Sequence, residues 1–253
     1  MIKLLNLLLE TIDKPKAIFL AGPAGAGKTT ILKQLIPLNT FTNINVDDTY
    51  EELLKSSGLG MNIKDFSPDE LSQAAKLMGS AQKITKEKYA ELTQSLKNVI
   101  IDGTGAASKP LLKKKQELEE LGYQTFMIAL YVSPITSLER NKNRERSLLP
   151  QIVLRTWRDY NKNIDIYRSE FKDNFVLINN DPEDVNKSYD ESEIKKLYFD
   201  TSLAKGKPKS PEEIEKSKIE KEKLNQDIND LLNIEREFNT VDQAKERLNN
   251  FLN

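Results

Sequence analysis

Residues 17–30 read Ala-Ile-Phe-Leu-Ala-Gly-Pro-Ala-Gly-Ala-Gly-Lys-Thr-Thr, and this stretch decides the fold. An apolar run leads into the pattern Gly-x-x-x-x-Gly-Lys-Thr, and the helix-like residues 30–36 follow it. A strand, a glycine loop and a helix start in this order are the required setting of a phosphate-binding P-loop. The alternative, a glycine-rich turn that only joins two elements, is disfavoured because the motif and its context agree. We therefore expect a nucleoside triphosphate to bind here.

The parts of this loop have separate expected tasks. Its glycines let backbone N–H groups turn toward a polyphosphate, and the helix start adds unpaired donors and a partial positive charge. Lys28 is expected to hold the β- and γ-phosphates, and the Thr29 hydroxyl is expected to ligate Mg²⁺. The expected cofactors are ATP and Mg²⁺, and the motif does not distinguish ATP from GTP. The expected nucleotide-binding residues are Gly22, Pro23, Ala24, Gly25, Ala26, Gly27, Lys28, Thr29 and Thr30.

Composition limits the chemistry that the chain can perform. Its 253 residues suffice for one α/β domain and a smaller appendage. The absence of cysteine excludes disulfides and thiolate chemistry, and the absence of histidine leaves a carboxylate as the simplest general base. A formal net charge of −1 gives no strong overall attraction to nucleic acid or acidic membranes, although a local basic groove stays open.

The N-terminal residues are the only candidate targeting segment. Their apolar run is interrupted by Asn6 and closed by Glu10, with no small-residue cleavage site after it, so a packed amphipathic helix over residues 1–13 is favoured over a signal peptide. No stretch approaches the ~20 apolar residues that a membrane span needs. We expect a cytoplasmic protein without a membrane segment.

The remaining apolar runs predict a parallel sheet. Short β-branched runs alternate with longer helical patterns, which is typical of βαβ units with helices on both faces of the sheet. Helix starts are marked at Ser67-Pro68, Ser133-Pro134 and Pro150, and Gly122 ends the helix that begins near Lys109. The predicted strands after the P-loop strand are residues 42–46, 98–101, 125–132 and 174–178.

The chain divides by composition into three parts. Residues 1–180 are the predicted P-loop domain, and residues 181–209 are a predicted polar linker with a short ordered piece at 194–198. Residues 210–253 predict a helical hairpin, with one helix from Ser210 and a second after the capping box that starts at Thr240. We favour a tail that packs on its own domain or self-associates over a dedicated partner-binding module, because thin apolar stripes mostly mark a buried face.

Two predicted strands end in acidic residues. Asp47 and Asp48 follow the second strand, where the carboxyl ends of parallel strands face the ligand crevice, so a carboxylate there can accept a proton from a substrate hydroxyl. The alternative is that this pair only caps the helix that begins near Thr49. Asp102 ends the third strand, as in a Walker B motif whose carboxylate orders Mg²⁺ or its waters, although many strands end in Asp-Gly without such a role.

Arginines cluster after the fourth predicted strand, at Arg140, Arg144, Arg146 and Arg155. Arginine donates fixed, bidentate hydrogen bonds to phosphate oxygens, and a mobile segment rich in arginine can close over a triphosphate. The alternative is a solvated helix face whose arginines form surface ion pairs. The spacing of the arginines alone favours neither this alternative nor the lid.

At these residues the chain resembles the P-loop kinases that comprise zeta toxins and phage polynucleotide 5′-hydroxyl kinases, over roughly residues 16–180. The run Asn43-Ile-Asn-Val-Asp47-Asp48 is similar to the segment in which a polynucleotide kinase activates its substrate hydroxyl, and residues 139–155 match the lid of those kinases without a gap. Asp102-Gly-Thr104-Gly looks more like the zeta-toxin version, in which an acidic residue at this position helps bind the substrate.

The resemblance implies an adenylate-kinase-like α/β fold, Mg-ATP as donor and a hydroxyl as acceptor. It implies that Asp47 is the base and that lid arginines neutralise charge on the moving phosphate. Two departures separate the chain from its relatives: Tyr50 stands where polynucleotide kinases carry an arginine, and Ala106 stands where zeta toxins often carry one. A nucleic-acid 5′-hydroxyl leads slightly as acceptor, with a nucleotide sugar close behind.

The predicted activity is therefore that of a Mg-ATP-dependent kinase. The alternative is a nucleotide switch or ATPase whose helical tail mediates assembly or partner binding. The predicted catalytic residues are Lys28, Asp47, Arg140, Arg144 and Arg146, the predicted substrate-binding residues are Asp48, Asp102 and Thr104, and the predicted metal ligands are Thr29 and Asp102.

Overall fold

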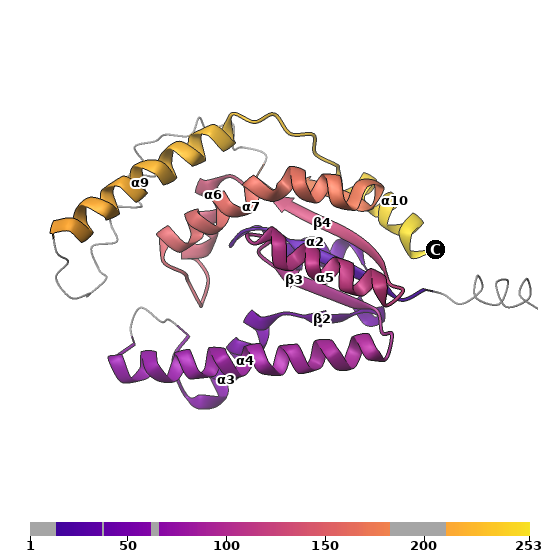
Figure 1. The fold of residues 1–253 in the computed structure, drawn as a ribbon, viewed down its shortest axis with the longest axis horizontal. Coiled ribbons are helices and arrows are strands. Elements are labelled where there is room, and N and C mark those ends of the chain that lie inside the picture. The colour runs from indigo at the N-terminus through magenta and orange to yellow at the C-terminus, as the bar shows by residue number, and fades with distance from the viewer. Residues whose placement is uncertain (1–13, 37, 62–65, 183–210) are drawn as a thin grey trace, which may run out of the picture.

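The computed structural model describes residues 14–36, 38–61, 66–182 and 211–253. Its centre is one parallel sheet in the order β2-β3-β1-β4-β5, of which Figure 1 labels β2, β3 and β4. The strand that leads into the P-loop is the central one, so the loop emerges at the middle of the carboxyl edge of the sheet. The strands are β1 (Lys16–Ala21), β2 (Thr42–Ile44), β3 (Val99–Gly103), β4 (Gln124–Tyr131) and β5 (Phe175–Asn179). All five predicted strands, and the predicted fold class, are confirmed.

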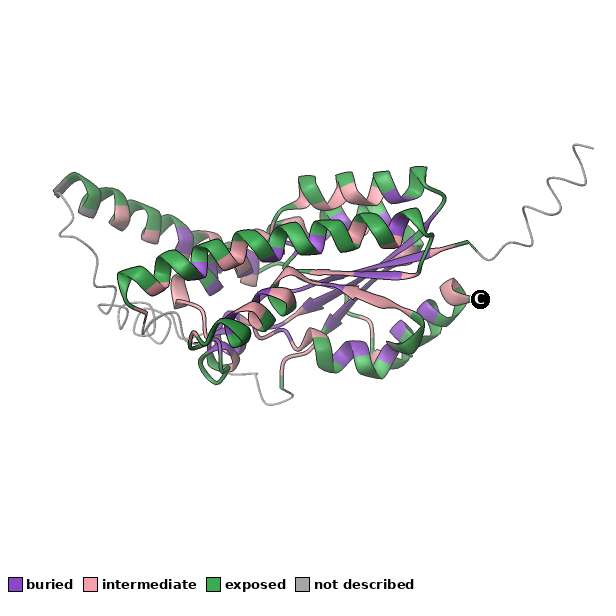
Figure 2. Cartoon of the chain, turned by 90° about the horizontal axis from the view of Figure 1, so that it is seen from below, coloured by how far each residue is buried: buried purple, intermediate pink, exposed green. Residues whose placement is uncertain are grey.

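Helices cover both faces of the sheet. The face that carries Ile18 and Ile128 packs against α2 and α10, and the face that carries Phe19 and Met127 packs against α5 and α7. Buried residues accordingly follow the strands and the inward sides of these helices (Figure 2). The helices are α2 (Lys28–Leu35), α3 (Val46–Ser57), α4 (Pro68–Gln94), α5 (Ser108–Glu120), α6 (Pro134–Lys142), α7 (Pro150–Phe171), α9 (Pro211–Leu232) and α10 (Val241–Leu252), with short 3₁₀ turns at Leu38–Thr40 and Lys172–Asn174.

Helix ends form where the sequence marks them. Ser67 makes a capping box with Glu70, and Ser133 caps α6 by accepting from the N–H of Thr136. Gly122, which follows α5, has a φ of +90°. The alternative that the Asp pair only caps this helix is wrong, because the structure begins α3 at Val46 and caps it with Asn45. Asp47 and Asp48 therefore lie in the first turn of α3, where negative charge is favourable.

Helices α3 and α4 form a separate small core beside β2, at the lower side of Figure 1. Tyr50 and Leu54 of α3 pack against Ala74 and Ala81 of α4 in this core. The pair holds the start of α3 next to the carboxyl end of β2. This arrangement positions the acidic turn of α3 at the same edge of the sheet as the P-loop.

The two predicted tail helices are present and pack on the P-loop domain. Leu224, Ile228 and Leu231 of α9 join a buried cluster around Trp157 of α7, and Ala244 and Leu248 of α10 lie beside α2 on the sheet. The two helices follow each other in the chain, as the predicted hairpin has them, but they pack on different parts of the domain. Helix α9 packs on α7, whereas α10 packs on α2 and β5. Packing on its own domain, the favoured alternative for this tail, is confirmed.

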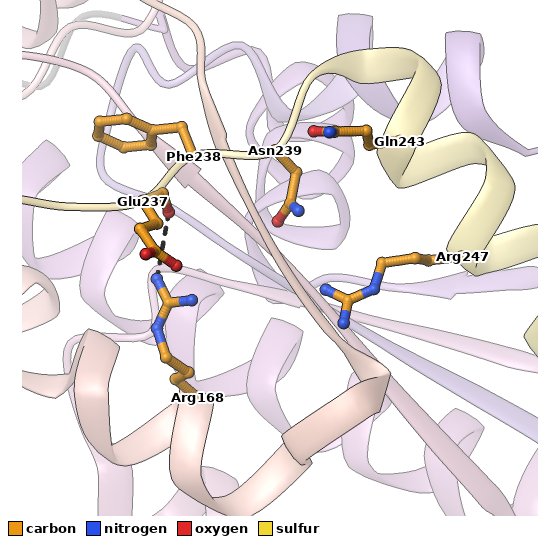
Figure 3. A pocket seen from close by; sticks show the side chains of 6 residues that line it. All are labelled: Arg168, Glu237, Phe238, Asn239, Gln243 and Arg247. Atoms are coloured by element: carbon orange, nitrogen blue, oxygen red, sulfur yellow. Dashed lines mark hydrogen bonds between the residues drawn. The ribbon is translucent and has the colours of Figure 1, made fainter.

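The residues between α9 and α10 run along the open edge of β5. Asn239 donates its N–H to the Leu177 carbonyl at 2.7 Å, and its side-chain oxygen accepts from the Leu177 N–H at 3.0 Å. Arg168 of α7 donates to the Glu237 carbonyl, and Phe238 lies against the ring of Tyr131. A hollow of about 510 Å³ lies here, lined by Arg168, Glu237, Phe238, Asn239, Gln243 and Arg247 (Figure 3). The contacts satisfy backbone groups at a strand edge that is otherwise open to pairing.

Some predictions fall outside the described residues. They are the N-terminal helix over residues 1–13, most of the linker at 181–209 and its short ordered piece at 194–198. In the described parts of the chain, no helix combines the length and apolar character that crossing a membrane requires.

The packing of α10 predicts a large effect of a single substitution far from the P-loop. Leu248 is fully buried, so Leu248→Ala should lower the free energy of unfolding by about 2–5 kcal/mol through lost burial and a cavity. Urea denaturation measures this change. Leu71→Ala on α4 is the matched control, since Leu71 is 45% exposed and its truncation should change stability by less than about 0.5 kcal/mol. Equal effects of the two variants would contradict the observed docking of α10.

Candidate active site

The P-loop connects β1 to α2 with two glycines in the left-handed region. Gly25 has a φ of +75° and Gly27, which caps α2, has a φ of +78°. Side chains with a Cβ rarely adopt this conformation, so the glycines are required by the path of the loop. The path brings the N-terminus of α2 to the carboxyl edge of the sheet, where its unpaired N–H groups can bind an anion.

Side chains from outside the loop bind three consecutive loop carbonyls. Ser137 Oγ donates to the Ala24 carbonyl at 2.5 Å, Arg140 Nη1 to Gly25 at 3.1 Å, and Asn180 Nδ2 to Ala26 at 2.8 Å. A trans peptide carries its N–H opposite its C=O, so the N–H groups that follow these carbonyls point away from these three side chains, and that of Ala26 donates to the Pro23 carbonyl at 3.1 Å within the loop.

Lys28 and Asp102 lie together at the start of α2. Lys28 Nζ lies 3.8 Å from Asp102 Oδ1 and donates to the Gly22 carbonyl at 3.2 Å. Both side chains are largely buried, at 20% and 8% exposed. The structure thus brings the predicted phosphate-binding lysine and the predicted Walker B carboxylate into one ion pair.

The environment of Asp102 fits a site for a bound cation. Asn45 donates to Asp102 Oδ2 at 2.8 Å, but the buried Oδ1 has no hydrogen-bond partner among the described residues. Burial raises the pKa of the Asp102 carboxyl to about 6, and the Lys28 ammonium opposes the rise. Among the described residues no cluster of three or more acidic side chains forms a metal cage. One carboxylate and the exposed Thr29 hydroxyl suit Mg²⁺, which prefers few protein ligands together with waters and phosphate oxygens.

Asp47, the predicted base, lies in an ion pair with a lid arginine. Arg146 Nη2 lies 2.7 Å from Asp47 Oδ1, and Arg146 Nε lies 3.0 Å from Glu51 Oε1. The guanidinium also lies over the ring of Tyr50, with 5.5 Å between Arg146 Cζ and the ring centroid. Arg146 is only 6% exposed, whereas Asp47 stays 56% exposed and accessible. The predicted lid and the acidic turn of α3 are therefore in contact.

Asp48 lies beside this pair with a different environment. It accepts a hydrogen bond from Asn43 Nδ2 at 3.1 Å. Burial raises the pKa of the Asp48 carboxyl, with further increases from the charges of Glu51 and Asp47. Its neighbours thus favour the protonated form more than is usual for an aspartate.

The other predicted arginines occupy two different positions. Arg144 is 44% exposed and its Nη2 lies 4.0 Å from Glu51, so it stands at the open side of the acidic turn. Arg140 lies behind the P-loop instead, where its Nη1 and Nη2 donate to the carbonyls of Gly25 and Asn180. The prediction that Arg140 neutralises charge as the lid closes, together with Arg144 and Arg146, stays a prediction; in this structure both of its terminal nitrogens bind backbone oxygens.

Thr104 lies in the exposed loop after β3. This loop is held by α7, since Tyr167 donates to the Gly105 carbonyl at 2.6 Å and Asn163 donates to the Ala106 carbonyl at 2.9 Å. The Thr104 hydroxyl accepts from the N–H of Ala106. The predicted substrate-binding loop is thereby fixed next to Asp102.

The sequence did not single out several residues that shape this site. They contact the site through side chains whose partners are distant in the chain, and they are Asn45, Glu51, Ser137, Asn141, Asn163, Tyr167 and Asn180. Asn45 had a local signal, since an asparagine one residue before a helix is a common cap. The others carry no pattern that distinguishes them from ordinary polar residues.

Comparison with known proteins places this geometry in a family context. A model of the zeta toxin family matches residues 5–190. No curated protein matches the chain significantly.

Solved structures share the fold at low sequence identity. The complex AvrRxo1-ORF1:-ORF2 with ATP has a TM-score of 0.56 at 14% identity, covering 94% of this chain and 81% of that one. AvrRxo1-ORF1:AvrRxo1-ORF2 with sulphate ions has a TM-score of 0.55 at 17% identity. The match covers 68% of this chain and 56% of that one. The PezAT toxin–antitoxin system of the human pathogen Streptococcus pneumoniae has a TM-score of 0.44 at 20% identity, with coverages of 91% and 95%.

The raised pKa of Asp102 predicts a pH-dependent cost of burying this carboxylate. Its pKa is about 6 in the folded protein against an ordinary value of 3.8, so its contribution to stability is present below the lower value and is lost as pH rises through about 6. Asp102→Asn removes that loss. In the absence of ligand, the free energy of unfolding of the variant should therefore rise relative to that of the wild type as pH increases from about 5 to about 8, by up to about 2 kcal/mol.

Chemical denaturation of both proteins across this range measures the difference. The attraction of Lys28 acts on the ionised carboxylate and is already contained in the pKa of about 6, so the pH dependence of the difference is the diagnostic quantity. A stability difference that stays constant between the two pH values would contradict the assigned environment of Asp102.

Proposed function

The chain belongs to the zeta toxin family, and on that premise we propose that it is a kinase that transfers the γ-phosphate of Mg-ATP to a hydroxyl group. One observation carries this proposal. Lys28, Asp102 and Asp47 lie at the carboxyl ends of the adjacent strands β1, β3 and β2 or in the helix starts that follow them. A donor site, a cation ligand and a base are thereby assembled at one edge of the sheet, where open α/β sheets bind their ligands.

The donor phosphates are proposed to lie in the P-loop at the start of α2. Loop N–H groups and the Lys28 ammonium are proposed to face them, and the carbonyls of Ala24, Gly25 and Ala26 are bonded by side chains from outside the loop. Asp102 and Thr29 are proposed to hold Mg²⁺, which neutralises charge on the phosphates when it is bound. These residues position the donor, and phosphoryl transfer needs little covalent chemistry from the protein beyond such positioning.

Asp47 is proposed to take the proton from the acceptor hydroxyl. Its carboxylate is 56% exposed in the first turn of α3 and lies 2.7 Å from Arg146 Nη2, which fixes its direction. Arg144, at the open side of the same turn, is the lid residue proposed to reach the transferring phosphate. Asp48 and Thr104 are proposed to contact the acceptor.

The acceptor is proposed to be a nucleotide sugar in preference to a nucleic-acid 5′ end. The family supports this order, which reverses the slight preference that the lid motif alone gives to a 5′-hydroxyl. The charges of α3 support it as well, since Asp47, Asp48, Glu51 and Glu52 gather in its first two turns. Such an acidic surface repels the phosphate backbone of a polynucleotide.

The alternative of a switch with a tail for assembly gains no support from the fold. Leu224, Ile228 and Leu231 of α9 and Ala244 and Leu248 of α10 are buried against the kinase domain, and Ile219 is the one large apolar residue of these two helices that is exposed among their described side chains. We therefore propose that the tail is part of the kinase scaffold.

Two substitutions test the assigned roles of the donor and base residues. Lys28→Ala should abolish phosphate transfer because it removes the charge that holds the donor phosphates. Asp47→Asn should leave ATP binding in place but lower the transfer rate by about 10²- to 10⁴-fold, the range for a lost general base. Calorimetry with ATP and single-turnover transfer of labelled phosphate measure the two effects.

Glu52→Gln is the matched control for Asp47→Asn, because it removes one exposed carboxylate from the same helix. It should transfer phosphate at the wild-type rate. Unchanged transfer by Asp47→Asn would refute its role as base.

A competition between acceptors tests the substrate class. The wild type is incubated with γ-labelled ATP and either nucleotide sugars or 5′-hydroxyl oligonucleotides. We expect label on the nucleotide sugar and at least tenfold less on the oligonucleotide, since the acidic turn disfavours a polyanion. Preferential labelling of the oligonucleotide would overturn the proposed acceptor while preserving the kinase assignment.

A further inference from the structure

We propose that Arg140, Asn180 and Ser137 form a clamp that sets the peptide orientation of the P-loop, so that Arg140 acts as a positioning residue and not on the transferring phosphate. The inference rests on the proposed function, because the ligand of this loop is the donor triphosphate. It assigns Arg140 a role different from the one that its place in the lid motif implies.

The clamp binds three carbonyls that follow one another in the chain. Ser137 and Arg140 reach Ala24 and Gly25 from α6, and Asn180 reaches Ala26 from the end of β5. Each bonded carbonyl fixes the direction of the N–H in the same peptide plane. The clamp therefore fixes the directions of the Gly25 and Gly27 N–H groups directly, and it holds the Gly25–Ala26 peptide in the orientation in which the Ala26 N–H donates to the Pro23 carbonyl.

Arg140 also joins the two halves of the clamp. Its Nη1 donates to the Gly25 carbonyl and its Nη2 donates to the Asn180 carbonyl at 3.0 Å. A planar guanidinium can bind two oxygens at a fixed angle, whereas a lysine ammonium offers only a point charge. Arginine at position 140 thus holds the P-loop and the end of β5 in a fixed relation.

The glycines of the loop leave the space that the clamp fills. A Cβ at Gly25 would lie 2.9 Å from the Ser137 carbonyl oxygen and 3.0 Å from Arg140 Cβ. A Cβ at Gly27 would lie 2.3 Å from Asn180 Nδ2. The backbone of α6 therefore excludes a Cβ at Gly25, whereas a Cβ at Gly27 would displace the Asn180 amide from the clamp, and both glycines have positive φ angles.

Helix α6 is itself anchored on both sides of the clamp. The N–H of Ser133 donates to both carboxylate oxygens of Asp181, the residue after Asn180, at 2.9 Å. Asn141 binds the N–H and the carbonyl of Leu148 at 3.0 and 2.9 Å. One helix therefore connects the P-loop, the end of β5 and the lid segment.

Loss of the clamp should weaken ATP binding before it affects the chemical step. Without bonded carbonyls the loop peptides can rotate in the free protein. Binding of the triphosphate must then fix their orientation, and this loss of conformational entropy weakens binding. We expect Arg140→Gln and Asn180→Ala each to raise the Kd for ATP by about 10- to 100-fold, the range for losing one or two charge-assisted or buried hydrogen bonds. Arg140→Lys should fall between the wild type and Arg140→Gln.

The test measures ATP binding to the full chain by calorimetry in the presence of Mg²⁺, followed by transfer rates at saturating ATP. Lys142→Gln is the matched control, because it removes an exposed positive charge two residues from Arg140 on the same helix. It should bind ATP as the wild type does. The double variant Arg140→Gln/Asn180→Ala should bind little worse than either single variant, since both disrupt one clamp. Thermal unfolding establishes that each variant is folded, and if Arg140→Gln does not fold, Asn180→Ala gives the decision.

Three outcomes separate the possibilities. Weakened ATP binding in both single variants, with a non-additive double variant, supports the clamp. Unchanged ATP binding with a lower transfer rate in Arg140→Gln overturns the clamp in favour of direct contact with the phosphate. Wild-type ATP affinity in both Arg140→Gln and Asn180→Ala overturns the clamp as well. Failure of the wild type to bind ATP refutes the proposed function itself and is seen before any variant is compared.

Discussion

Binding of a polyphosphate by bare backbone depends on where the carbonyl oxygens of that backbone find their partners. Donor and acceptor lie on opposite sides of a peptide, so a loop presents N–H groups to an anion only when its carbonyls are satisfied behind it. Here Ser137, Arg140 and Asn180 satisfy three of them in sequence. The rest of the site is placed relative to this loop, because Lys28 begins the helix after it and Asp102 ends the strand next to β1.

The tail reinforces the same region from two directions. Helix α10 packs on α2, the helix that begins at the P-loop, and α9 packs in one cluster with Ala24 of the loop and Trp157 of α7. Asn239 bonds the edge of β5 just before the strand reaches Asn180. Segments that are distant in the chain therefore support the donor site together, and the three-part division of the sequence does not correspond to independent packing.

The fold and the donor site were predictable because their signals are local. A Gly-x-x-x-x-Gly-Lys-Thr motif after an apolar strand specifies both the loop and its ligand, and alternating strand and helix patterns specify the sheet. The role of Arg140 was not predictable, since whether an arginine faces a phosphate or a carbonyl depends on the distance between α6 and the loop. The packing partners of α9 and α10 were not predictable either, because an apolar stripe indicates that a helix is buried but not which element covers it.

The acceptor side shows how one substitution can be compensated by a distant residue. Polynucleotide kinases of the similar family carry an arginine at the position of Tyr50, and here the Tyr50 ring is buried beneath the guanidinium of Arg146. The positive charge beside Asp47 thus comes from the lid segment and not from α3 itself. Since Arg146 also binds Glu51, any movement of the lid changes the charge around the proposed base. Movement of the lid and the charge beside Asp47 are therefore physically linked, because the same guanidinium takes part in both.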